Sequence, residues 1–359
     1  MKVSDEPGTS RRLARHIGRA LTPLGKGRLR SSWRPRAGGA LIPPGKMPGS
    51  MAGQRPAATT WEGQHLAGVS YSFDTQPLVG ETPVLARTAP QTIEWRDLVA
   101  LTPLEKIWEL GLGLPWLILS LWCYARGWWW AGLACSFYVF LTGLRQSHNA
   151  QHYSLGLPRR IQDCVLFALS MLMLASMHAV QVTHLHHHRH CLEDEDGEGA
   201  TARLPWWRAL LAGPLFYTRL HVSAWRLGSR RKRVWIATEL TAIAFVIAFS
   251  FCFAACTALR WHVTAMLAGE CLTGFFAVWT VHHGCEAHEP GRTQRGRWLI
   301  LVSYSMFFHA EHHLFPAVPT AHLAEVARRL DAAVPQIRQR AVISLGGGIS
   351  HHTTAVVKL

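Results

Sequence analysis

The sequence predicts an all-α integral membrane protein with four transmembrane helices in two hairpins. Of the 359 residues, 49 % are hydrophobic and only 16 % carry a charge, a balance typical of membrane proteins. Four apolar runs are long enough to cross a bilayer, and tryptophans lie near several of their ends, as in the aromatic belts at membrane surfaces.

The four runs pair along the chain. Runs 107–124 and 128–144 are separated by Ala-Arg-Gly, and runs 234–257 and 262–281 by Ala-Leu-Arg-Trp, so each pair predicts a tight helical hairpin. A fifth run, 164–177, is shorter than the ~20 residues that span the hydrocarbon. We expect it in the membrane interface or against the helix bundle.

The placement of Lys and Arg predicts the orientation. The leader, the 145–233 loop and the segment after residue 282 are basic, whereas each hairpin turn carries one Arg. Cytoplasmic segments carry the excess of positive charge. We therefore expect a multi-pass protein with both termini and the long central loop in the cytoplasm.

We divide the chain into a leader (1–95), a membrane domain (96–340) and a flexible C-terminal tail (341–359). Residues 1–60 hold twelve Lys or Arg against two acidic residues, without an apolar periodic face, which predicts disorder. We favour a non-functional leader, upstream of a start at Met47 or Met51, over a targeting segment or a tether to anionic lipid. No aromatic residues interleave usefully with these arginines, so nucleic acid is not an expected partner.

The C-terminal part of the membrane domain contains an amphipathic pattern. Within 322–340, Leu323, Val326 and Leu330 share one helical face, so this segment is expected to begin as a helix. The eight cysteines form no CxxC pair, and six of them lie inside apolar runs. They therefore predict neither a zinc ribbon nor a disulfide framework.

Three histidine clusters stand beside the apolar segments, on the predicted cytoplasmic side. They read HNAQH at 148–152, HLHHH at 184–188 and HAEHH at 309–313. Helical neighbours three and four residues apart share a face, so each box directs its imidazoles toward one point. One HxxHH pattern is expected roughly 0.07 times by chance at this histidine content, yet two occur. The box histidines are His148, His152, His184, His187, His188, His309, His312 and His313.

Eight histidines are too many for one tetrahedral zinc ion but suit two metal ions with open positions. Imidazole ligands without a thiolate or carboxylate box favour iron that handles O₂, with zinc as the second choice. The chain lacks HExxH, and its only Glu-x-x-His pair, Glu62 with His65, lies in the leader. Zincin and carboxylate-bridged di-iron sites are therefore excluded.

These motifs resemble those of the membrane fatty acid desaturases and their hydroxylase and ketolase relatives. The resemblance covers roughly residues 100–335 and depends on HNAQH, on HLHHHRH with the acidic stretch after it, and on HAEHHLFPAVP at 309–319. It implies four transmembrane helices, a cytosolic helical cap that carries the boxes, two irons that activate O₂, and the eight box histidines as ligands. It also implies electrons from ferredoxin or cytochrome b5. No HPGG haem motif occurs, so the donor is expected to be a separate protein.

The family usually adds one ligand after the fourth span. VHHGCEAH at 281–288 offers His282, His283 and His288, and we prefer His283 at the helix end, with His288 close behind. Some members place an Asn, which holds a metal-bridging water, about one turn before that ligand. The only Asn of this chain is Asn149, so that feature is absent or replaced.

Other polar groups are assigned simpler roles. His186 and His190 are expected to point away from the box, and the acidic stretch 193–198 to form a solvated loop or a donor-docking surface. The histidines that match no box are expected to be structural; they are His178, His221, His262 and His322.

We expect an O₂-dependent di-iron desaturase that introduces a double bond into a fatty acyl chain. The alternative is a hydroxylase or ketolase acting on a lipid, a carotenoid or a small amino-acid-like substrate. A histidine-rich metal transporter is a distant alternative, because it requires ionisable ligands inside the spans. The spans contain little of that kind beyond Glu109, Glu239 and Glu270.

Overall fold

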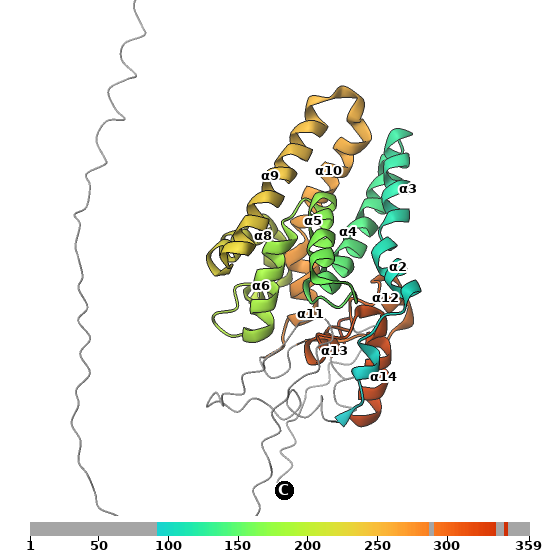
Figure 1. Ribbon diagram of the computed structural model, residues 1–359, viewed down its shortest axis with the longest axis vertical. Coiled ribbons are helices and arrows are strands. Elements are labelled where there is room, and N and C mark those ends of the chain that lie inside the picture. Colours follow the sequence, from blue (N-terminus) through green and yellow to red (C-terminus); the bar gives the residue numbers. More distant parts are fainter. Residues whose placement is uncertain (1–91, 287–290, 335–340, 344–359) are drawn as a thin grey trace, which may run out of the picture. The chain divides into compact units, whose positions relative to one another are not determined.

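The computed structural model describes residues 92–286, 291–334 and 341–343 (Figure 1). All described residues belong to one compact unit, which falls within Gly63–Leu359. Most of the predicted leader 1–95 and tail 341–359 therefore lie outside the described residues. The described parts are helical and contain no strand beyond isolated bridges at Thr293, so the all-α prediction is confirmed.

The helices follow one another with short connections. The α-helices are α2 Pro103–Gly111, α3 Leu114–Ala125, α4 Trp129–Gln151, α5 Arg159–Met173, α6 Met177–His190, α7 Trp206–Leu211, α8 Gly213–Leu227, α9 Arg230–Cys252, α10 Thr257–Glu270, α11 Thr280–His282, α12 Arg297–Val302, α13 His309–Leu314 and α14 Leu323–Ala333. A π-helical turn, Gly274–Trp279, joins α10 to α11.

Three helical segments in the described ranges are long and apolar enough to cross a membrane: Pro103–Ala125, Arg230–Cys252 and Thr257–His282. A fourth is counted if α5 and α6, which are bent by 110° at their junction, form one broken span. Helix α4 contains the predicted run 128–144 but is not among the three. Its C-terminal part, from Arg145 onward, is polar and buried, which lowers its mean hydropathy.

The largest core lies where α4, α5, α9 and α10 meet (Figure 1). Val139 and Phe140 of α4 pack with Leu166 and Met173 of α5 and with Met266 of α10. The run 164–177 thus packs against the bundle, as expected.

Helix α5 ends at Leu174, which adopts a left-handed conformation with φ of 60°. Helix α6 begins at Met177, and the side chain of the preceding Ser176 caps it by accepting a hydrogen bond from the backbone N–H of Ala179. This sharp turn directs α6, with its histidines, away from the direction of α5.

Helix α14 has the predicted amphipathic character. Leu323, Val326 and Leu330 are buried in a second core with Phe308 and Phe315. This core holds the third box against the C-terminal helix. Residues 335–340, the rest of the predicted segment, lie outside the described part.

Gly213, the first residue of α8, packs directly against Cys271, the residue that follows the C-terminal end of α10. A Cβ at Gly213 would lie 1.7 Å from the carbonyl oxygen of Cys271. Because that neighbour is backbone, it cannot swing aside, and only glycine permits this close approach.

Gly213→Ala is expected to destabilise the protein by about 1–3 kcal/mol, the usual cost of overpacking. Gly111→Ala is the matched control, since a Cβ at Gly111 meets nothing within 4 Å. Thermal unfolding of the detergent-solubilised protein measures both. Equal melting temperatures for the two variants would contradict this account of the α8–α10 contact.

Candidate metal centre

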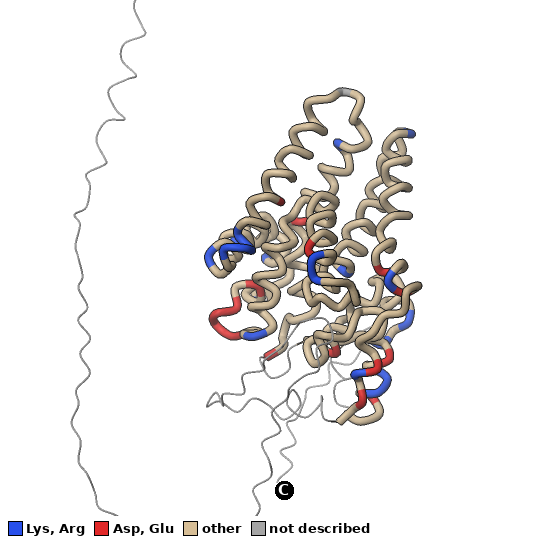
Figure 2. The backbone as a smooth tube through the Cα atoms, viewed as in Figure 1, with Lys and Arg blue, Asp and Glu red and all other residues tan. Residues whose placement is uncertain are grey.

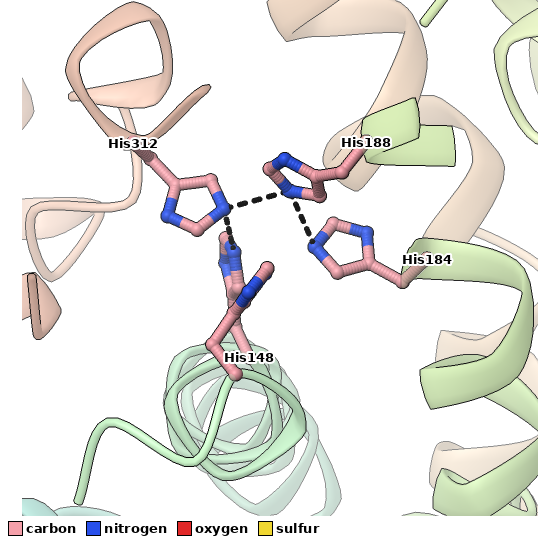
Figure 3. A group of neighbouring side chains, drawn as sticks. His148, His184, His188 and His312 are labelled. Carbon is pink, nitrogen blue, oxygen red and sulfur yellow. Dashed lines mark hydrogen bonds between the residues drawn. The ribbon is translucent and has the colours of Figure 1, made fainter. Parts of the chain in front are cut away.

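The three histidine boxes meet at one end of the helix bundle. Box 1 lies at the C-terminal end of α4, box 2 on α6 and box 3 on α13. His148 and His184 point toward His188 and His312 from three different helices (Figure 3). Helical spacing within each box and the fold between boxes therefore place the imidazoles in one cluster.

Five histidines form the first group. Their ligand nitrogens all lie within 4.8 Å of one another. The Nε2 atom of His312 is 2.7 Å from Nε2 of His148 and 2.9 Å from Nε2 of His188. The members are His148, His152, His184, His188 and His312.

A second group lies beside the first. It contains four residues whose possible ligand atoms lie within 4.8 Å of one another: His187, Cys191, His282 and His313. His309 adjoins this group, because its Nε2 atom is 2.8 Å from Nε2 of His282 and 3.1 Å from Nε2 of His313. All eight box histidines are thus brought together in two adjacent groups.

The additional histidine in the second group is His282. Its Nε2 atom is 3.1 Å from Nε2 of His187. His283, the preferred residue from the sequence, turns away: its Nδ1–H donates to the carbonyl of Ala202 at 2.8 Å, and its ring stacks on Trp279. His288 lies outside the described residues. The π-helical turn before α11 rotates the following side chains relative to a regular helix, which the sequence pattern did not reveal.

Carboxylates orient two of the box 2 rings. Asp196 accepts a hydrogen bond from Nδ1 of His187 at 2.7 Å, and Glu198 accepts one from Nδ1 of His184 at 3.2 Å. Asp196 is only 3 % exposed and also accepts from the backbone N–H groups of Leu192 and Gly199. The expectation of a solvated loop was therefore wrong for Asp196 and for Glu198, whose side chain is only 10 % exposed. It holds for residues 193–195, which are exposed.

A buried network fixes box 1 to its surroundings. Glu109 of α2 pairs with Arg145 and accepts from the Asn149 side-chain amide at 2.9 Å. The carbonyl of the same amide accepts from the backbone and hydroxyl of Thr320 at 3.0 and 2.8 Å. Asn149, which directly follows the first histidine of box 1, therefore links α4 to the segment that follows box 3.

A similar network positions box 3. Glu311, buried in α13, accepts hydrogen bonds from Arg295 and from the hydroxyl of Thr293, both at 2.6 Å. Arg295 also pairs with Asp331 of α14. Arg295 therefore links α13 to α14. This contact holds α13, which carries three box histidines, on the side of the helix opposite the cluster.

The other histidines make local contacts and belong to neither group. Those at 178, 221, 262 and 322 each contact a carboxylate or a backbone carbonyl, which fits the structural role expected of them. His186 and His190 pair with each other, with ring centroids 4.5 Å apart, and point away from the box 2 ligands as predicted.

The rings suit metal ions because their lone pairs converge. Where Nδ1 donates to a carboxylate, as in His187, the neutral ring presents Nε2 as an acceptor, which is the form that binds a metal. Burial lowers the pKa of His312 well below its ordinary value, and the neighbouring His148 and His152 lower it further. The same two causes lower the pKa of five further rings, so these rings are neutral near pH 7; they are His148, His152, His188, His309 and His313. His187 differs: although burial opposes it, the hydrogen bond to Asp196 raises the pKa of this ring well above its ordinary value, so metal binding there displaces a proton. The donor set fits two metal ions.

An apolar cavity of about 270 Å³ reaches this cluster. Its walls come from α4, α8, the π-helical turn and α12, and include Leu141, Phe276 and Val302. His148, His184 and His309 line the cavity as well. A long apolar molecule in this cavity would therefore lie directly beside both histidine groups.

Asp196→Asn is expected to lower the metal affinity of the second group by about 10–100-fold, the usual cost of losing the partner that orients a histidine ligand. Asp194→Asn, the same change two residues earlier at an exposed carboxylate, is the control. Competition with a zinc chelator measures both affinities. Equal affinities would remove the orienting role of Asp196.

Comparison with known proteins identifies the family of this chain. A family model described as fatty acid desaturase matches residues 127–343, which contain all three boxes. A search of curated proteins found no match. The chain belongs to the fatty acid desaturase family.

Proposed function

We propose that this protein is an integral-membrane, di-iron, O₂-dependent desaturase that introduces a double bond into a fatty acyl chain. The observation that carries the proposal is the apolar cavity that adjoins both histidine groups. The family favours an oxidation of this class. The ligand assignment consists of the eight box histidines and His282, which takes the place first given to His283.

When bound by these histidines, two iron ions would supply the chemistry by which O₂, with electrons from the donor protein, attacks an unactivated C–H bond. The chain itself positions the substrate. The apolar walls of the cavity hold an acyl chain extended and exclude water, and the carbons that lie beside His148 and His309 are the ones exposed to the ions. Desaturation and hydroxylation share such a site and differ in how the substrate carbons are held.

The distribution of charge supports a cytoplasmic metal site. Charged residues gather at the end of the bundle that carries the boxes (Figure 2), whereas the turn after α3 contributes Arg126 alone. By the positive-inside rule, this distribution supports a cytoplasmic position for the boxes, and we propose the same side for both termini. Electrons come from a separate protein of the ferredoxin or cytochrome b5 type, which reaches the site from the same side.

His312→Ala is expected to abolish turnover and to lower the iron content from about two ions per chain, because the Nε2 atom of His312 lies 2.7 Å from Nε2 of His148 and 2.9 Å from Nε2 of His188. His186→Ala is the matched control: the same substitution in a residue that points away. Expression of the full chain in a host of known lipid profile, followed by mass spectrometry of the lipids, measures turnover. Iron is quantified on the purified protein.

The product mass decides the reaction. Loss of two hydrogens supports desaturation, whereas gain of one oxygen assigns the protein to the hydroxylase branch of the family. Full turnover in His312→Ala would overturn the ligand assignment. A zinc-bound protein without iron-dependent activity would overturn the proposal as a whole.

Ala277→Trp is expected to lower turnover on the order of 10²-fold by displacing the substrate, because Ala277 lines the cavity. Ala268→Trp is the control, since Ala268 is exposed on the same helical segment. Iron content should be unchanged in both. Equal turnover of the two variants, measured by product mass spectrometry, would show that the cavity does not hold the substrate.

A further inference from the structure

The second histidine group contains a thiol. The Sγ atom of Cys191 lies within 4.8 Å of the ligand nitrogens of His187, His282 and His313, which are themselves mutually that close. Atoms bound to one metal ion at about 2.0–2.3 Å cannot be much farther apart than this. The four residues therefore satisfy the distance condition for a single ion.

The position of Cys191 in the chain explains the contact. It follows His187 by four residues, so the two side chains share a helical face, and Sγ is 3.8 Å from Nε2 of His187. Cys191 is the C-cap of α6, with φ of −49° and ψ of 117°. The chain leaves the helix at this residue and turns toward Asp196, so the thiol stays beside the box.

The two groups differ in the number of imidazoles. The first has five, whereas the second has four when His309 is counted with it. One helical turn before His282 stands Val278, which is apolar and only 2 % exposed. The side chain of Val278 cannot bind the second ion or hold a water molecule beside it. Among the described residues of the second group, the thiol of Cys191 is the one donor that is not a histidine.

We propose that Cys191 is a thiolate ligand of the second metal ion. The inference rests on the metal centre of the proposed function. On binding, the S–H bond breaks, the proton leaves to solvent, and the sulfur lone pair forms the bond to the ion. The mutually close group would then give the ion three nitrogen ligands and one sulfur ligand. A thiolate donates more electron density than an imidazole, so the two ions would differ electronically.

The test uses the purified full chain loaded with zinc, examined by X-ray absorption at the zinc edge. The expected result is a sulfur shell at about 2.3 Å, distinct from nitrogen at about 2.0–2.1 Å. Cys191→Ser should lose this shell. Cys285→Ser is the control, because Cys285 lies three residues after His282 but outside the group; it should keep the shell.

Thiol alkylation gives a second readout. Bound zinc should slow the modification of Cys191 by at least about tenfold, since a coordinated thiolate is held by the metal, and should leave the exposed Cys164 unchanged. Peptide mass spectrometry measures both rates. A control at Cys164 reports any general effect of metal on the fold.

The outcomes separate the two proposals. Two bound zinc ions with nitrogen and oxygen shells only, or equal alkylation of Cys191 with and without metal, would overturn the cysteine ligand and leave the proposed function intact. A sulfur shell that persists in Cys191→Ser would do the same. Failure of the wild-type chain to bind any metal would overturn both.

Discussion

Nine imidazole rings share a small volume, and they would repel one another strongly if all were protonated. Burial and the neighbouring rings lower the pKa of most of them, including His148 and His312. His187 is the exception, because Asp196 supplies a counter-charge and its pKa is raised. The rings also need partners for their nitrogens. Carboxylates meet this need on the outside, as Asp196 does for His187, and the Nε2 atoms are left facing one another. The sharp turn after α5, the π-helical turn and the networks around Asn149 and Glu311 all serve to bring these nitrogens together.

The sequence could predict which histidines come together because their spacing is helical, and the three boxes do lie on helices α4, α6 and α13 or at their ends. It also predicted the burial of one face of α14. It could not decide between His282 and His283, since the choice depends on a π-helical turn that has no sequence signature. It missed Cys191 and Asp196, which reach the site through the turn after α6. The signal available was the spacing of Cys191, four residues after His187, but an isolated cysteine carries little weight in a sequence.

Two of the three acidic residues inside the spans, Glu109 and Glu239, make structural contacts. Glu109 pairs with Arg145, and Glu239 accepts from Ser176 and from Nδ1 of His178 at 2.5 and 2.6 Å. Both tie neighbouring helices together rather than line a path. This fits an enzyme whose polar groups gather at one end of the bundle, with an apolar cavity beside them.

The bond between Asn149 and Thr320 has a consequence for biogenesis. When α4 has just entered the membrane, its polar end can already pair with Glu109, but the acceptor on Asn149 has no partner until the ribosome has made the chain beyond residue 320. The members of each histidine group likewise come from segments about 130 to 160 residues apart. The cluster is therefore completed late in synthesis, and a nascent chain stalled before box 3 would present an incomplete set of donors for the proposed ions.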